Sequence, residues 1–269
     1  MRDDKIDVAR GVAFLLMIVH HFSFFWDLSK TVGLDDLSSA RGVGPVPSAC
    51  GWVARHAFIL IAGIALGTQI RGQSGPSESE QRESQSGVLR RRLVRCVEIG
   101  AHAALVSLVT YLAIPGAWVR FGVLHFLCVG LGVTAVMLSV PRVVGAVLGI
   151  GLLWLAFRQE TGIPWLDTAT GARPVGAMVD WFPLRRWLPL LWLGVGIGWI
   201  GWSSSPKEAN EANEAKSGES GFGVGLLRFV GRHSLVLYTA HYVALCALVA
   251  LIASHRAGAE RSRVARLIL

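Results

Sequence analysis

The chain carries little charge for its length. Of its 269 residues only 16% are Asp, Glu, Lys or Arg, whereas 52% are hydrophobic, and the mean hydropathy is +0.50. A typical soluble domain is about 25% charged, so this composition argues against a soluble globular protein. The apolar residues form blocks long enough to cross a bilayer, which takes about 20 helical residues. The sequence therefore predicts a multi-pass integral membrane protein.

Several common chemical motifs are also lacking. The four cysteines lie in apolar segments without metal-ligand spacing, so we expect buried thiols and no metal. The sequence has no phosphate-binding loop, no G-x-S-x-G elbow and no H-E-x-x-H motif. The first apolar stretch lacks a small-residue cleavage site, so no cleavable signal peptide is expected. The net charge of +8 is attributed to membrane topology and not to nucleic-acid binding, because no soluble basic domain is present.

We predict an all-α bundle of about seven transmembrane helices, since a helix satisfies its own backbone hydrogen bonds in lipid. The chain is expected to form one domain over residues 1–269, with spans near 8–27, 50–70, 94–113, 120–140, 143–158, 187–203 and 223–253. Two polar linkers, 71–87 and 203–221, are rich in Ser, Glu and Gly and are predicted to be disordered.

The distribution of Lys and Arg favours a cytoplasmic N-terminus. On that side the seven spans place Arg10, a cluster that includes Arg91 and Arg92, and Arg232. The basic tail after Arg256 falls on the other side, against the same rule, which leaves the number of spans and the side of the C-terminus open.

Polar residues occur at membrane depth in the first span. At 100° per residue, Asp7, Arg10 and His21 fall on one stripe about 80° wide, and His20 lies about 100° from His21. Arg10 and His21 are separated by about 16 Å along the axis. An ionisable stripe of this kind is expected to face a protein-lined cavity. The alternative is that Asp7 and Arg10 cap the helix while His21 makes one structural hydrogen bond.

Two later spans carry further histidines. His125 is expected roughly 7–8 Å below the outer boundary, the same depth as His21, so the two side chains are predicted to be partners. The alternative is that His125 makes an interhelical hydrogen bond. In the last span Ser234, Tyr238 and His241 lie within about 60° on a helical wheel, with His241 near mid-membrane. Histidine exchanges protons near neutral pH and can act as a nucleophile, so a path of histidines flanked by arginines suits transfer of an activated group across the bilayer.

Five segments together resemble the heparan-alpha-glucosaminide N-acetyltransferase catalytic-domain family. They are "KIDVARGVAFLLMIVHHF", "HAFILIAGIALG", "FGVLHFLCVGLG", "DWFPLRRWLPLLWLGVGIG" and "GRHSLVLYTAHYVAL", in the family's order. The resemblance implies an acyltransferase that moves an acetyl group from cytoplasmic acetyl-CoA to an extracytoplasmic sugar amine or hydroxyl. It also implies a bacterial inner-membrane location. His21 matches the position where bacterial relatives keep a histidine, and the chain has no histidine between His21 and His56.

These observations assign roles to specific residues. The predicted catalytic residues are His21, His125 and His241, with His21 as general base or transient acyl acceptor. The predicted donor-binding residues are Arg10, Asp7, Arg232, Arg91 and Arg92, because arginine's planar fork suits phosphate. The predicted substrate path comprises Tyr238, Ser234 and His20.

The sequence is compatible with more than one function. The expected partners are acyl-CoA, an extracytoplasmic glycan or amino sugar and the lipid bilayer, with homo-oligomerisation undecided. The competing function is a non-catalytic membrane protein or small transporter that uses the histidines for proton relay. The sequence does not choose between N- and O-acylation.

Overall fold

The protein is described from a computed structural model. The structure describes residues 4–31, 44–71, 78–157, 160–173, 178–200 and 221–268. Within these ranges the regular secondary structure is helical, and strand-like pairing is limited to one isolated bridge between Phe121 and Trp181. The all-α prediction is therefore confirmed.

Most residues of the described ranges belong to helices. Their bounds are α1 Asp4–Thr31, α2 Pro45–Arg71, α3 Glu78–Ala113, α4 Val123–Met137, α5 Arg142–Phe157, α6 Pro164–Thr170, α7 Leu184–Ile200, α9 Phe222–Arg232 and α10 Ser234–Ile268. Four of them, α1, α2, α3 and α10, are long and apolar enough to cross a membrane, and α4 and α5 contain shorter apolar helices. With the many exposed large hydrophobic side chains on these helices, this makes the chain a membrane protein.

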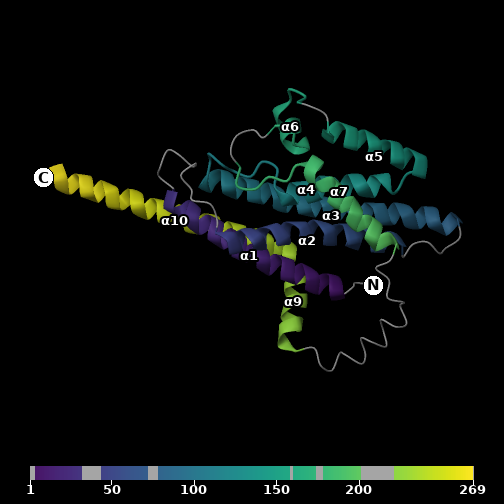
Figure 1. Ribbon diagram of the computed structural model, residues 1–269, viewed down its shortest axis with the longest axis horizontal. Coiled ribbons are helices and arrows are strands. Elements are labelled where there is room, and N and C mark those ends of the chain that lie inside the picture. Colours follow the sequence, from purple (N-terminus) through teal and green to yellow (C-terminus); the bar gives the residue numbers. More distant parts are fainter. Residues whose placement is uncertain are drawn as a thin grey trace.

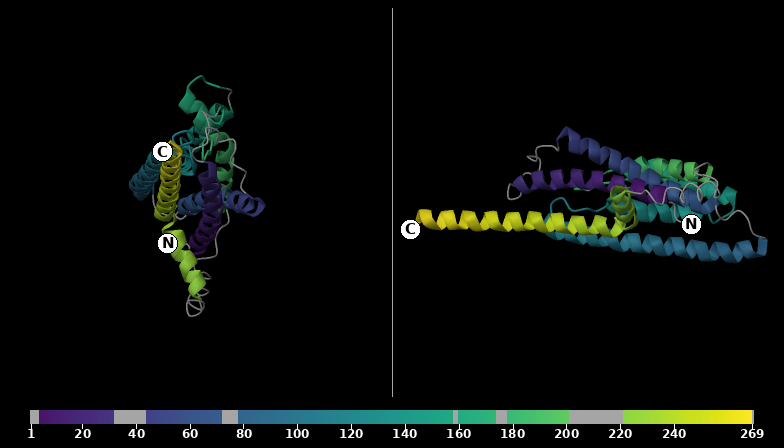
Figure 2. Two further views of the ribbon diagram at one scale, coloured as in Figure 1. Left: turned by 90° about the vertical axis from the view of Figure 1, so that its left-hand side faces the viewer. Right: turned by 90° about the horizontal axis from the view of Figure 1, so that it is seen from below.

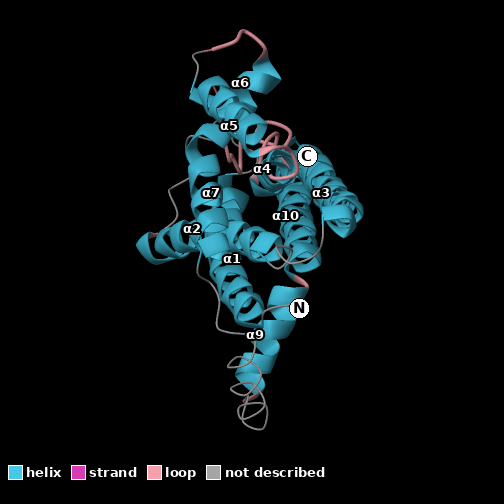
Figure 3. Ribbon diagram, turned by 90° about the vertical axis from the view of Figure 1, so that its right-hand side faces the viewer, coloured by secondary structure: helices cyan, strands magenta, loops and turns pink. Residues whose placement is uncertain are grey.

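The long helices run roughly along one axis, and the smaller elements lie around them (Figure 1). Helix α9 crosses this axis close to the beginning of α1, and α10 carries the C-terminus to the opposite end (Figures 1 and 2). Viewed along the bundle, α5 and α6 lie on one side and α9 on the other (Figure 3).

Helices α1 and α10 run parallel to each other. Near the beginning of α1, Asp7 pairs with Arg232, which directly precedes α10. Near the other end, the Arg256 guanidinium donates to the carbonyl oxygen of Ser29 at 2.6 Å. The end of α10 therefore lies at the opposite end of the bundle from the beginning of α1.

The structure changes two of the expected boundaries. The predicted span 223–253 is two helices, because the chain turns at His233 and α9 leaves the bundle axis. Helix α9 exposes Phe222 and Phe229, as expected for a helix at a lipid interface and not inside a bundle. Helix α3 begins at Glu78, inside the linker predicted for 71–87, while residues 72–77 and 201–220 lie outside the described residues.

The tightest helix pair is α2 with α7. A Cβ on Gly63 would collide with the carbonyl oxygen of Leu191, and one on Gly194 would collide with that of Leu60, so small residues let the two backbones touch. Trp192 of α7 also donates its indole N–H to Thr134 of α4 at 3.0 Å. Helix α2, which these contacts hold against α7, contributes side chains to two cavities of the protein.

Candidate active site

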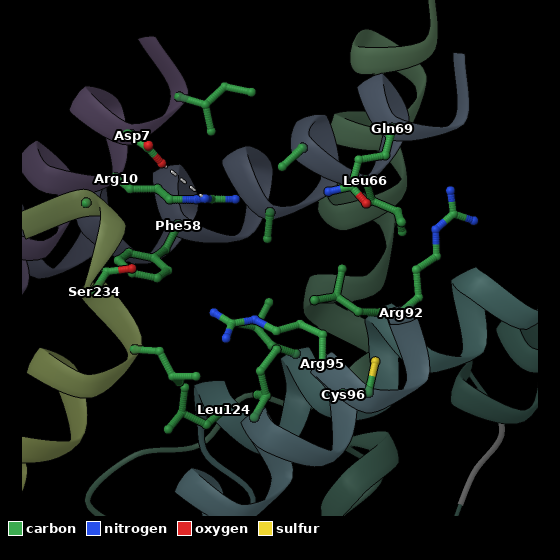
Figure 4. A pocket seen from close by; sticks show the side chains of 18 of the residues that line it. Asp7, Arg10, Phe58, Leu66, Gln69, Arg92, Arg95, Cys96, Leu124 and Ser234 are labelled. Atoms are coloured by element: carbon green, nitrogen blue, oxygen red, sulfur yellow. Dashed lines mark ion pairs between the residues drawn. The ribbon is translucent and has the colours of Figure 1, made fainter. Parts of the chain in front are cut away.

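A large cavity of about 1000 Å³ opens among α1, α2, α3, α4 and the beginning of α10. This volume is at the upper end of ordinary ligand pockets, about 300–1000 Å³. Its polar lining includes Asp7, Arg10, Gln69, Arg91, Arg92, Arg95, Arg232 and Ser234. Figure 4 shows Arg10 from α1 and Arg95 from α3 extending into it from opposite sides. The Asp7 and arginine positions predicted for donor binding therefore share one cavity, and Arg95 joins them.

A buried carboxylate organises the arginines on one side of this cavity. Asp7 is fully buried and lies 3.6 Å from Arg10 Nη1, while Arg232 donates from Nε to Asp7 at 3.2 Å. Arg232 also donates to Asp4 at 2.9 Å. The hydrogen bonds with Asp4 and Asp7 raise the pKa of Arg232 above its ordinary value, so this guanidinium stays charged. Asp7 thus orders Arg10 and Arg232 and is not itself suited to bind an anion.

Arg92 differs from those two arginines. Its Nε and Nη2 atoms are buried against the cavity wall, and no hydrogen-bond acceptor among the described residues reaches them. Buried guanidinium donors without partners are costly. Neighbouring Arg95 instead pairs with Glu98 at 2.5 Å. Arg92 is therefore the arginine best prepared to receive an anionic ligand.

His21 and His241 meet at the middle of the α1–α10 contact. The distance from His21 Nδ1 to His241 Nε2 is 2.8 Å, and the rings are nearly parallel with centroids 5.1 Å apart. Tyr242 packs edge-on against His21 at 4.9 Å, and Phe14 packs edge-on against His241 at 5.7 Å. His21 is buried, so the pair is largely enclosed by aromatic rings.

The hydrogen bonds of this pair fix a consistent set of protons. His241 Nδ1 lies 3.3 Å from the carbonyl oxygen of Leu237, which can only accept, so Nδ1 carries the hydrogen. With both rings neutral, His241 Nε2 must accept a hydrogen bond from His21 Nδ1. His21 Nε2 then keeps its lone pair, and His241 holds the His21 ring in the tautomer that makes Nε2 a base.

A second, smaller cavity of about 60 Å³ lies beside His21. One water needs roughly 10–15 Å³ of such space, so a few waters or one small functional group fit. His20, His21, Arg55, Asp180 and Tyr238 supply its polar groups. Met17, Val123 and Tyr238 line both cavities. These three residues therefore form the wall that separates the large cavity from the side chains of His20 and His21.

Asp180 is brought to this cavity by two non-helical segments. The backbone of 178–182 bonds to that of 117–121, through Val179 N to Ala117 O and Phe182 N to Phe121 O, both at 2.9 Å. The Asp180 carboxylate consequently reaches the beginning of α4 and accepts from the Val123 N–H at 3.1 Å.

The surroundings of Asp180 control its charge. Burial raises the pKa of Asp180 to about 6, although the Val123 N–H, the nearby Arg55 charge and a hydrogen bond from Tyr238 each oppose this rise. A Cβ at position 122 would lie 2.7 Å from the carboxylate, so Gly122 leaves the room that Asp180 occupies. Asp180 is thus a carboxylate that changes charge near neutral pH, facing the same cavity as His21.

The predicted partnership of His21 with His125 is wrong. His125 Nδ1 accepts from the Gly122 N–H at 3.3 Å, and its Nε2 lies 3.2 Å from the Ser107 hydroxyl, which itself donates to Val119. Both ring nitrogens are used to hold the beginning of α4, and His125 lines neither cavity. Equal depth along two helices was the reason for the prediction, but depth does not fix which face a side chain occupies.

The remaining predicted residues are placed as follows. His20 Nδ1 donates to the carbonyl oxygen of Pro47 at 3.0 Å, so it fastens α1 to α2 while its ring lines the small cavity. Ser234 and Tyr238 line the large cavity one turn apart on α10. Among the described side chains, no group of three or more His, Cys, Asp or Glu is arranged to hold a metal ion.

Comparison with known families bears on the whole site. The family model described as heparan-alpha-glucosaminide N-acetyltransferase, catalytic, matches residues 2–243 of the chain. The chain belongs to this family. No curated protein and no solved structure matches it. The matched residues include Asp7, Arg10, His21, Asp180 and His241, so both cavities of this heparan-alpha-glucosaminide N-acetyltransferase family member lie within the region that defines a membrane acetyltransferase family.

Sequence reasoning missed two residues of this family member's small cavity. Arg55 received no role from the sequence, and Asp180 was included only within one of the five family-like segments, yet both residues line the same cavity as His21. A lone acidic residue next to Trp181 in an otherwise apolar stretch was the only available signal. The contact between the loops 114–122 and 178–183 positions Asp180 at the cavity. These loops are far apart in the sequence, so the sequence does not reveal this contact.

Proposed function

We propose that this protein is an integral membrane acyltransferase that takes an acetyl group from cytoplasmic acetyl-CoA and gives it to an extracytoplasmic sugar amine or hydroxyl. The observation that supports this most strongly is the meeting of two unlike cavities. One is large and lined with arginines, the other small and lined by His21, and they share the wall formed by Met17, Val123 and Tyr238. Membership in an acetyltransferase family supports the same reaction class.

The large cavity suits the acyl donor. The phosphates of coenzyme A would bind Arg92, whose buried donors have no acceptor among the described residues, with Arg91 and Arg10 nearby. The thioester arm would then extend along α1 towards Met17 and Tyr238. Eleven residues of α1 separate Arg10 from His21, about 16 Å along the helix. The phosphate-binding arginines and the proposed base therefore lie at different depths in the membrane.

The small cavity suits the reacting group of the acceptor. His21 Nε2 would remove a proton from the acceptor nitrogen or oxygen as that atom attacks the thioester carbonyl carbon. The carbon–sulfur bond then breaks, the acetyl group remains on the acceptor, and the imidazolium returns its proton to the leaving thiolate. His241 stabilises the transient positive charge on His21 through their hydrogen bond.

The arginine end is placed on the cytoplasmic side in this proposal. Arg10, Arg92, Arg95, Arg228 and Arg232 all lie at the end of the bundle where α1 begins, and positive residues collect on the cytoplasmic side of membranes. The small cavity then lies towards the extracytoplasmic side, where a glycan would be presented. The whole chain acts as a single domain in this scheme.

The direct test is acetyl transfer by the purified protein in lipid nanodiscs, with radiolabelled acetyl-CoA as donor and glucosamine as acceptor probe. We expect saturable coenzyme A binding and labelled product from the wild-type protein. The variant His21→Ala should bind coenzyme A normally and form no product above background.

A matched control is His56→Gln, because His56 of α2 bonds to Trp52 and lines neither cavity. Its transfer rate should stay within about twofold of the wild-type rate, as expected for a substitution outside the site. Wild-type activity in His21→Ala would overturn the assignment of the base. No coenzyme A binding, together with proton-driven flux in liposomes, would instead support the transporter alternative.

A further inference from the structure

The wall between the two cavities is built around one aromatic side chain. Tyr238 is 3% exposed, and it is the only residue with a titratable side chain among the three that line both cavities. Its ring packs edge-on against His21 at 6.0 Å and against His241 at 5.1 Å. The ring therefore stands between the arginine-lined cavity and the histidine pair.

The hydroxyl of this ring interacts with polar groups at the small cavity. The Tyr238 hydroxyl interacts with the Asp180 carboxylate and with the side chain of Tyr242, and Asp180 also accepts from the Val123 N–H. The carboxylate is fixed by the contact between loops 114–122 and 178–183, so it belongs to a rigid part of the protein. By contrast, Tyr238 lies on α10, whose beginning adjoins the turn at His233.

The small cavity can also hold the wrong nucleophile. Its 60 Å³ accommodate a few waters beside His21, and water activated by His21 Nε2 would hydrolyse a thioester that reached it. A barrier is needed that keeps the thioester away until an acceptor has arrived. The polar hydrogens of an amine or hydroxyl acceptor are chemically equivalent to the Tyr238 hydroxyl as donors to Asp180.

We propose that Tyr238 is a partition that Asp180 holds closed and that the acceptor opens. An acceptor N–H or O–H takes the place of the Tyr238 hydroxyl beside Asp180, and the released Tyr238 ring swings out of the wall, so that thioester and acceptor meet beside His21. This inference rests on the proposed function, and it names Tyr238 and Asp180 as positioning residues that decide between transfer to the acceptor and transfer to water.

The test compares two reactions of the same protein in nanodiscs. Hydrolysis is measured as coenzyme A release from acetyl-CoA without acceptor, and transfer as labelled product with glucosamine. In the wild-type protein, hydrolysis should be slow beside transfer. Tyr238→Phe keeps the ring and loses the hydroxyl that interacts with Asp180, and we expect its hydrolysis to rise several-fold. Tyr238→Ala removes the partition, and hydrolysis should rise by about tenfold or more relative to transfer, because water is no longer excluded.

Tyr111→Ala provides the matched control, since Tyr111 is 52% exposed on α3 and lines neither cavity. Its ratio of hydrolysis to transfer should equal that of the wild type. Coenzyme A binding shows that each variant is folded. A Tyr238→Ala protein that binds coenzyme A but keeps the wild-type ratio would overturn the partition. Failure of the proposed function would look different, because the wild-type protein would then neither bind coenzyme A nor form product.

Discussion

The two cavities of this protein differ in their volume and in the charged side chains that line them. In the large cavity several arginines face a volume of about 1000 Å³, and Asp7 and Asp4 hold Arg10 and Arg232 in place through ion pairs. In the small cavity one carboxylate and one guanidinium share about 60 Å³ with histidines and aromatic rings. The first arrangement is suited to binding a large anionic ligand, and the second to moving a proton at one atom.

This difference shows that one helix can supply ligand-binding residues to one cavity and a proton-accepting residue to another. Helix α1 supplies Asp7 and Arg10 to one cavity and His21 to the other, while α10 follows it in parallel with Tyr238 and His241. Substitutions at the two ends should therefore affect different kinetic parameters.

The largest difference in transfer rate is expected between variants of His21 and His125, the two histidines that the sequence placed at the same membrane depth. His21→Gln should lower the transfer rate by about 10²–10⁴-fold, the usual contribution of a general base. His125→Gln should lower the midpoint of thermal unfolding, because His125 holds the beginning of α4, but should leave most of the transfer rate. Rates and unfolding midpoints of both variants in nanodiscs make the comparison. Equal losses of transfer in the two variants would contradict the assignment.

An intermediate effect is expected at Asp180. Asp180→Asn should reduce transfer by about 10- to 100-fold, since small misplacements of positioning groups cost up to that much. The affinity for coenzyme A should not change, because Asp180 lines only the small cavity. A weaker affinity with an unchanged maximal rate would place Asp180 on the binding side instead.

The same variant should show a pH dependence of stability. The pKa of Asp180 is raised to about 6 in the folded protein, above its ordinary value of 3.8, so the folded state favours the protonated carboxyl. The ionised carboxylate therefore costs stability at pH 8, and this cost shrinks as the pH falls through 6. Asp180→Asn should raise the midpoint of thermal unfolding more at pH 8 than at pH 5. A gain that is larger at pH 5 would contradict the sign.

The smallest effect is expected at the arginine end. Arg92→Gln should weaken coenzyme A binding by about tenfold, as for the loss of one charge-assisted hydrogen bond, with little change in the maximal rate. Arg90→Gln is the matched control, because Arg90 is exposed on the same helix and does not line the cavity. Isothermal titration of both variants decides this, and equal affinities would show that Arg92 does not anchor the donor.

Much of the architecture could be predicted because lipid imposes simple rules on a sequence. Apolar length identified the long helices, and the 100° periodicity placed Asp7, Arg10 and His21 on one face of the first. The same periodicity placed Ser234, Tyr238 and His241 on one face of the last helix. The one-helix prediction for 223–253 failed, because apolar content does not distinguish one continuous helix from two helices joined by a turn, such as α9 and α10.

What the sequence determined by itself was the class of protein and the residue types available to its site, since hydropathy and periodicity are local properties. Only the tertiary structure decided which residues meet. It paired His21 with His241 and not with His125, because α1 and α10 run parallel in contact while His125 faces Ser107. It also brought Asp180 to the beginning of α4 through two loops distant in sequence. Contacts of this kind depend on how helices rotate and cross, which no local pattern specifies.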